Sequence, residues 1–158
     1  MDLRMHYMFL LKSAASSQSS PHQAHKRIAS ELSDWILYRK YWEETDTMEA
    51  MASGIGVPRE ELASLLHYWT GDVYMTLRKR LRINDAKEML AQRPQMSIAQ
   101  VARTVGFLDK SDFRKAFTEE TGYPPRLWRE CRGNALRCRI RMILGEGRSR
   151  CPSRRKSA

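Results

Sequence analysis

A chain of 158 residues, 42% hydrophobic and 29% charged, is long enough to form one globular domain of ordinary size. No apolar run approaches the roughly 20 residues of a membrane-spanning helix, and no signal peptide is evident, so we expect a cytoplasmic protein without a membrane partner. The formal net charge of +10 favours polyanionic partners, nucleic acid first.

The sequence contains no pattern that indicates catalysis, a metal or a cofactor. Its three cysteines, Cys131, Cys138 and Cys151, include no C-x-x-C pair, and its four histidines make no metal-binding pattern. No nucleophile–base pair, glycine-rich phosphate loop or pair of carboxylates stands out. We therefore expect a protein that is not an enzyme, with no catalytic residue, no metal site and no cofactor.

Composition divides the chain into a leader, a helical region and a tail. Residues 1–23 end in a serine-rich stretch and are expected to be a flexible leader, too short for a sensor or effector domain. Residues 24–132 show helical periodicity and no lasting strand alternation, which predicts an all-α domain of about seven helices. Residues 133–158 hold eight Lys or Arg against one Glu, which predicts a basic, disordered tail in which 135–144 could form one amphipathic helix.

Several helix boundaries carry local signals. Helices are expected, in chain order, at 25–41, 47–54, 58–68, 72–92, 97–106 and 109–122, with a short last helix after Pro124. Pro58 suits a first helical turn. Ser97 and Gln100 are spaced as a capping box, in which each side chain bonds the backbone of the other residue. Asp109 is placed to cap the next helix, and Gly122 to end it.

Two helix-turn-helix units are indicated, at 47–68 and 97–121, because each has a short helix, a tight turn containing glycine, and a second helix. The two units end in a weak internal repeat, with Thr-Gly at positions 70–71 and again at 121–122. The helix expected at 72–92 joins them. At 1.5 Å per residue it is about 30 Å long, close to the ~34 Å of one turn of B-DNA. Such a linker would set two DNA-reading helices about one turn apart.

The second half of the chain resembles the DNA-binding domain of the AraC/XylS family of transcription regulators. The resemblance rests on the segments 82–90 (RINDAKEML), 97–102 (SIAQVA), 105–107 (VGF), 112–117 (DFRKAF) and 121–125 (TGYPP). It covers about residues 28–132 and is looser before 71. It implies two helix-turn-helix units joined by one long helix, with each recognition helix in a major groove. Arg82 matches a recurrent arginine of the family, for which both a buried, backbone-pairing role and a phosphate contact stay open.

The expected second recognition helix has a basic outer arc. At 100° per residue, Phe113, Ala116 and Phe117 share one side and predict a packed face. The opposite arc is the candidate DNA-contacting set: Lys110, Ser111, Arg114, Lys115 and Thr118. Arg and Lys side chains can donate to guanine O6 and N7 or hold a phosphate.

The expected first recognition helix departs from the family pattern. Its outer arc, and candidate DNA-contacting set, is Arg59, Glu60, Ala63, Ser64 and His67. Pro58 replaces the usual capping Ser or Thr, and His67 and Tyr68 stand where basic pairs are usual. Residues 24–71 hold five Lys or Arg against eight Asp or Glu, so this unit should repel phosphate and bind DNA more weakly.

The resemblance implies a sequence-specific DNA-binding regulator that reads promoter DNA, with double-stranded DNA as its partner and RNA polymerase as a possible second one. No small-molecule effector domain is visible. The acidic first unit motivates an alternative, a protein-interaction module with the same fold and only non-specific, salt-driven DNA affinity. A third possibility, a DNA-repair methyltransferase with a similar domain, would need upstream cysteines, and none precedes Cys131.

Overall fold

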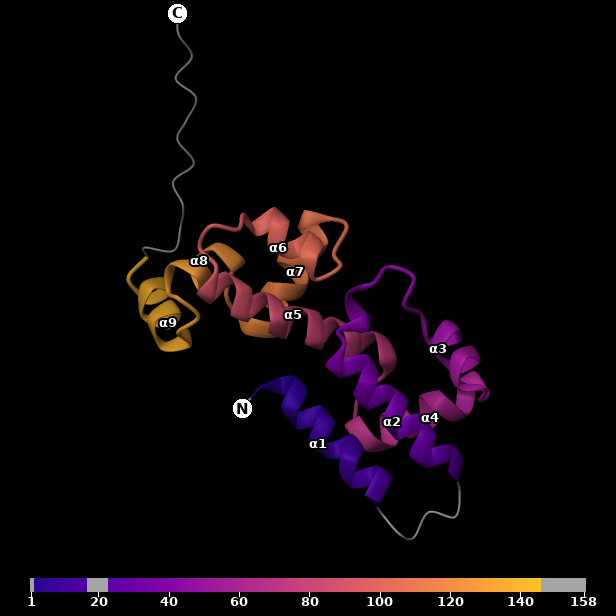
Figure 1. The fold of residues 1–158 in the computed structure, drawn as a ribbon. Coiled ribbons are helices and arrows are strands. Elements are labelled where there is room, and N and C mark those ends of the chain that lie inside the picture. Colours follow the sequence, from indigo (N-terminus) through magenta and orange to yellow (C-terminus); the bar gives the residue numbers. More distant parts are fainter. Residues whose placement is uncertain (1, 17–22, 146–158) are drawn as a thin grey trace, which may run out of the picture.

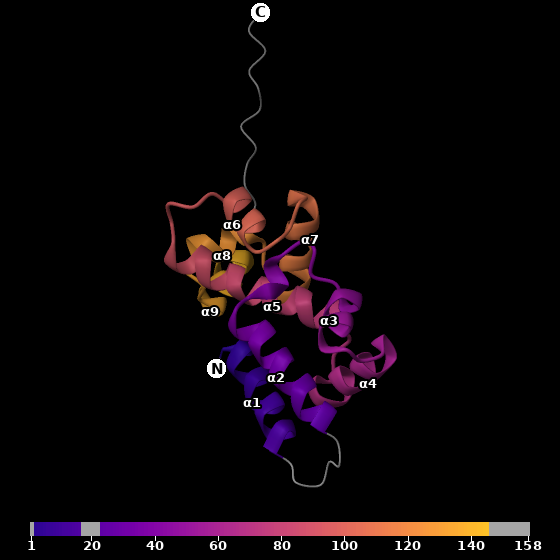
Figure 2. The same ribbon diagram turned by 45° about the vertical axis from the view of Figure 1, so that its right-hand side comes forward.

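All regular secondary structure in the described part of the chain is helical. The computed structural model describes residues 2–16 and 23–145, and no strand occurs among them, which confirms the all-α class. The helices in chain order are α1 (Leu3–Ser16), α2 (Gln23–Leu37), the 3₁₀ helix η1 (Lys40–Trp42), α3 (Met48–Ile55), α4 (Arg59–Thr70), α5 (Tyr74–Gln92), α6 (Ile98–Thr104), α7 (Lys110–Thr121), α8 (Pro125–Glu130) and α9 (Ala135–Ile143). Figure 1 shows α5 running between two groups of helices, α1–α4 and α6–α9, and Figure 2 shows the same division after rotation.

Helices α2 to α8 are the seven expected from the sequence, and the bounds of α3 to α7 lie within two residues of the expected ones. Helix α2 differs, because it ends at Leu37 instead of continuing to Tyr41. Arg39 adopts a left-handed conformation, with φ of 53°, and the chain turns into η1. The turn places the Tyr41 side chain fully inside the protein, where its hydroxyl donates to Asp85 at 2.7 Å. Burial of this aromatic ring offsets the cost of leaving the helix early.

The two helix-turn-helix units are α3–α4 and α6–α7. In the first, Thr47 caps α3 by accepting from the Ala50 N–H, and Gly56 turns the chain with φ of 77°. In the second, Ser97 and Gln100 form the complete capping box. The Asp109 side chain accepts from two backbone N–H groups at the start of α7. The local signals in the sequence therefore correctly marked where these helices begin.

Helix α5 contributes to two separate hydrophobic cores. Its first half places Tyr74, Leu77 and Leu81 in a core shared with α1, α2, α3 and α4. Its second half places Ile83 and Leu90 in a core shared with α6, α7, α8 and α9. Because one continuous helix supplies both cores, α5 fixes the separation of the two units.

The prediction that residues 1–23 form a flexible leader is wrong for most of that segment. Residues 3–16 form α1, which packs along α2, with Tyr7 and Leu11 buried in the first core. Leu3, Tyr7, Leu10 and Leu11 recur at helical spacing, so α1 buries one apolar side and is stabilised by that contact. The end of the expected leader, residues 17–22, lies outside the described residues.

The prediction of a disordered tail from residue 133 is also wrong for its first part. Residues 135–143 form α9, which begins at the cap residue Asn134 and buries Cys138 against the second core. Its contact with α8 holds this helix in the fold. Residues 146–158, with most of the expected tail, lie outside the described residues. No helix among the described residues is both long and apolar enough to cross a bilayer.

Candidate nucleic-acid interface

Helix α7, the expected second recognition helix, is held rigidly at its start and along its inner side. The Asp109 carboxylate accepts from the N–H groups of Ser111 at 2.6 Å and Asp112 at 3.0 Å. Phe113 and Phe117 are fully buried, and their rings pack on each other with centroids 5.6 Å apart. A helix fixed in this way can present its outer side chains in a constant orientation.

The outer side of α7 carries the five residues expected to contact DNA, and all five are exposed: Lys110, Ser111, Arg114, Lys115 and Thr118. Thr118 donates to the carbonyl of Arg114 on its own helix. Among the described residues, no acidic side chain pairs with Lys110, Arg114 or Lys115. These three cations are therefore available to an anionic partner.

One cation near α7 was missed by the sequence analysis. Arg126 in α8 borders a shallow pocket of about 330 Å³ together with Arg114 and Thr118. It is held by Glu130, whose carboxylate lies 3.1 Å from the Arg126 Nε. Arg126 lies outside the helix-turn-helix pattern, so only the packing of α8 shows that it extends the basic surface of α7.

Helix α4, the expected first recognition helix, presents a different surface. Four of its candidate residues are exposed and Ala63 is half-buried; the four are Arg59, Glu60, Ser64 and His67. Pro58 precedes the helix and provides no side-chain cap, as expected from its residue type. The two candidate sets lie on separate units and do not come together in one site.

The candidate set on α4 contains one arginine, Arg59, and this arginine is already paired. Arg59 Nε lies 2.6 Å from a carboxylate oxygen of Glu49 in α3. A backbone hydrogen bond and this guanidinium lower the pKa of Glu49, so the pair stays charged near neutral pH. A pocket of about 460 Å³ opens beside the pair, bordered by Met48, Ala63 and Met75. The outer surface of the first unit thus offers little unpaired positive charge.

Arg82 of α5 joins the segment in and after η1 to the turn of the second unit through backbone carbonyls. Its guanidinium donates to Tyr41 O at 2.6 Å and to Glu43 O at 3.2 Å on one side, and to Gly106 O at 2.8 Å on the other. The side chain is buried, and burial lowers the pKa of Arg82 to about 10, so it remains charged at neutral pH. The buried, backbone-pairing role is the one that the structure shows.

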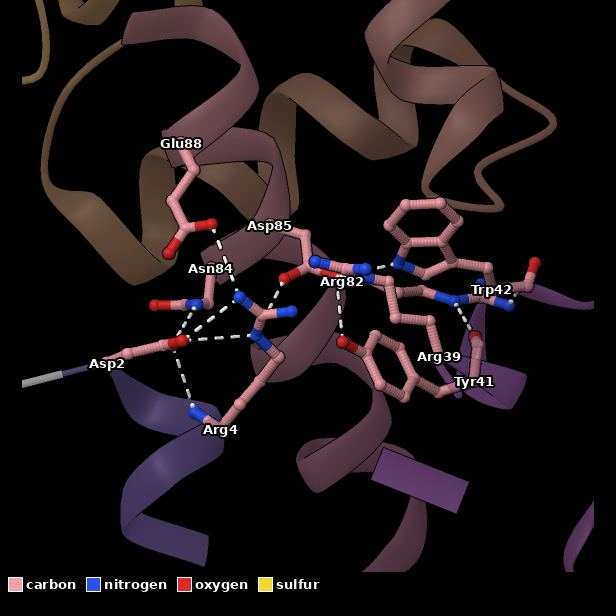
Figure 3. A network of polar contacts seen from close by, with 9 residues as sticks. All are labelled: Asp2, Arg4, Arg39, Tyr41, Trp42, Arg82, Asn84, Asp85 and Glu88. Atoms are coloured by element: carbon pink, nitrogen blue, oxygen red, sulfur yellow. Dashed lines mark hydrogen bonds and ion pairs between the residues drawn. The ribbon is translucent and has the colours of Figure 1, made fainter. Parts of the chain in front are cut away.

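A second set of polar contacts surrounds Asp85, three residues further along α5 (Figure 3). Its buried carboxylate accepts from the Tyr41 hydroxyl at 2.7 Å and the Trp42 indole N–H at 2.8 Å. Arg4 and Arg39 each lie 3.3 Å from one of its oxygens. The sequence analysis did not single out Asp85, because its partners lie 43 to 81 residues away along the chain. Only the fold brings them together.

No group of three or more His, Cys, Asp or Glu side chains among the described residues could hold a metal ion. Cys131 and Cys138 are both buried and free. Burial and the neighbouring Cys131 raise the pKa of the Cys138 thiol to about 12, which keeps it protonated and unreactive.

Comparison with known proteins identifies the same domain. A helix-turn-helix domain family model matches residues 51–130, half of the chain. The chain is 31% identical over 84 residues to the RCS-specific HTH-type transcriptional activator RclR of Escherichia coli, and 30% identical over 83 residues to the HTH-type transcriptional activator RhaR of Cronobacter sakazakii. These alignments cover 53% and 52% of this chain but only 29% of each relative.

Solved structures share the fold. The C-terminal domain of AraT, a response regulator from Geobacillus stearothermophilus, superposes with a TM-score of 0.59 at 21% identity, over 73% of this chain and 88% of that one. The C-terminal domain of the response regulator yesN from Fusobacterium nucleatum gives a TM-score of 0.58 at 21% identity, over 64% and 97%. The family match over residues 51–130 and the similarity to the two activators show that the chain belongs to the AraC/XylS family of DNA-binding transcription regulators.

Proposed function

We propose that this protein binds promoter DNA sequence-specifically and reads the major groove mainly through α7. The observation that carries the proposal is a set of three exposed cations, Lys110, Arg114 and Lys115, which pair with no acidic side chain of the described residues. They lie on a helix that is capped at its start and anchored by buried phenylalanines. Arginine and lysine at such positions can donate to guanine, while Ser111 and Thr118 can bond bases or phosphates.

The first unit has a smaller part in DNA binding. Its candidate residues, Arg59, Glu60, Ala63, Ser64 and His67, combine one ion-paired arginine with an exposed carboxylate. Glu60 can accept from cytosine N4 but repels phosphate. We propose that α4 positions the protein on a neighbouring groove, or faces RNA polymerase at the promoter, rather than supplying most of the affinity.

The experiment is selection of binding sites from a random duplex pool near physiological salt, followed by affinity measurements on the selected sites. The full chain is compared with the Lys110→Ala, Arg114→Ala, Lys115→Ala triple variant. A matched control, Lys26→Ala, Arg137→Ala, Arg139→Ala, removes the same charge from exposed positions on α2 and α9. An enriched motif that loses one half-site in the first variant and persists in the control supports the proposal.

The alternative is a protein-interaction module that binds DNA without sequence preference. The acidic surface of the first unit, with Arg59 held by Glu49, favours it. In that case no motif is enriched, and both triple variants lose affinity equally on every sequence, with the same dependence on salt.

A further inference from the structure

Helix α1 lies outside both helix-turn-helix units and runs antiparallel to α2, with its first residues next to α5 (Figure 1). It packs against α2 and α4. Tyr7 and Leu11 are buried in the first core, and the Tyr7 hydroxyl donates to Asp72, which precedes α5. The middle of α1 is thus fixed to the first core.

The start of α1 contacts the half of α5 that supports the second unit (Figure 3). Asn84 Nδ2 donates to the Asp2 carboxylate at 2.9 Å. Arg4 lies 3.4 Å from Glu88 and 3.3 Å from Asp85. Since the neighbouring Ile83 and Ala86 belong to the second core, α1 contacts Asp72 just before α5 and also the half of α5 that lies beyond the point where the two cores divide.

Arg4 also compensates a buried charge. Asp85 is 2% exposed, and its Oδ2 atom receives both hydrogen bonds, from Tyr41 and Trp42. The Oδ1 atom has no hydrogen bond within the described residues and faces the Arg4 guanidinium. A buried carboxylate without a compensating cation is costly. The position of α1 is therefore tied to the charge balance in the middle of α5.

We propose that α1 is a strap that sets the relative orientation of the two helix-turn-helix units, with Arg4 as its positioning residue. This inference rests on the proposed function, because a fixed orientation matters when two grooves are read at a defined separation. A long helix such as α5 can bend between the two groups of helices that it joins. The contacts of α1, added to those of Arg82, restrict that bending and so restrict the half-site spacing that the protein accepts.

The first test measures spacing. Duplexes carrying the selected site are compared with versions in which the spacer between half-sites is longer or shorter by one base pair. The wild type should prefer the selected spacing strongly. In Arg4→Met, which keeps an unbranched side chain about as long as the aliphatic stem of arginine but removes the charge, that preference should fall by about five-fold or more, while affinity for a single α7 half-site stays unchanged. Met5→Gln, at an exposed position of the same turn, is the control.

The second test needs no DNA and separates failure of the strap from failure of the proposed function. Spin labels are placed at Tyr68→Cys in α4 and Lys115→Cys in α7, both exposed, with Cys151→Ser in the background. The distance distribution between the labels should be narrow in the otherwise wild-type chain and broader with Arg4→Met. Asn84→Ala, which removes only the contact to Asp2, is the second variant if Arg4→Met does not fold.

An unchanged distance distribution in the folded variants would overturn the strap. The strap would also be overturned if the affinity of Arg4→Met depended on spacer length in the same way as that of the wild type. If the wild type selects no DNA site, the proposed function fails, and the label distances alone decide whether α1 orients the two units.

Discussion

Arg82 on the linker helix α5 donates a hydrogen bond to the carbonyl oxygen of Gly106 at 2.8 Å. The same guanidinium holds the carbonyl of Tyr41 at 2.6 Å. Gly106 sits in the turn of the second unit, immediately before the segment that leads into α7. The orientation of the candidate DNA-reading helix is therefore tied to a buried arginine on the linker helix.

The first prediction concerns Gly106, where φ is 87° and an added Cβ would lie 2.2 Å from Trp42 O and 2.8 Å from the Arg82 guanidinium carbon. Gly56 has a similar φ of 77° but open space around it. Gly56→Ala should cost about 1–2 kcal/mol of unfolding free energy through backbone strain alone. Gly106→Ala should cost roughly 1–3 kcal/mol more through the clash. Urea denaturation measures both, and equal losses would contradict the close approach.

The second prediction concerns the core under α7. Phe117→Ala should lower the unfolding free energy by about 3–5 kcal/mol, because the ring is fully buried against Phe113 and Trp128 and its removal leaves a cavity. Phe9→Ala, at a position 71% exposed, is the matched control and should change stability by no more than about 0.5 kcal/mol. Thermal and urea denaturation of the two variants would refute the core placement if their losses were similar.

The third prediction separates base reading from phosphate contact by Arg114. If Arg114 reads a base, Arg114→Ala should cost about 1–3 kcal/mol of binding free energy on the selected site and relax specificity at one position. Affinities for a set of single-base variants of the site provide the measurement. A loss of the same size on every sequence would assign Arg114 to a phosphate instead.

The fourth prediction concerns the cap of α7. Backbone hydrogen bonds from Asp112 and Ser111 hold the pKa of Asp109 below its ordinary value of 3.8. Because the folded carboxylate binds a proton less readily than the unfolded one, its contribution to stability is complete above 3.8 and is lost as the pH falls through the lowered pKa. Asp109→Asn keeps an acceptor without titrating. The stability advantage of the wild type over this variant should shrink below pH 3.8, and a constant difference would show that the carboxylate charge plays no part in the cap.

The fifth prediction concerns residues 146–158, which hold five Lys or Arg against one Glu. Deleting them, while keeping α9, should reduce the salt dependence of DNA binding by about 0.9 for every phosphate contact removed, and leave the preferred site unchanged. The slope of log affinity against log salt, on selected and unrelated duplexes, provides the measurement. A lost site preference would place the tail in the reading surface.

Local chemistry in the sequence predicted much of this fold. The capping box at Ser97 and Gln100, the cap at Asp109 and the glycine after α7 act over one to four residues, so they could be recognised without a structure. The apolar spacing of Phe113 and Phe117 likewise predicted the buried side of α7, and with it the exposed candidate residues on the opposite side.

Contacts between distant segments could not be predicted in this way. Helix α1 was expected to be a flexible leader because its stability comes from packing on α2 and from the pairing of Arg4 with Asp85. Both roles of Arg82 stayed open for the same reason, since its acceptors lie 24 to 41 residues away along the chain. The sequence by itself determined where helices begin and which sides are apolar, because these depend on neighbouring residues. The tertiary structure alone decided which buried charges are compensated and by which segment, because that depends on how the helices pack.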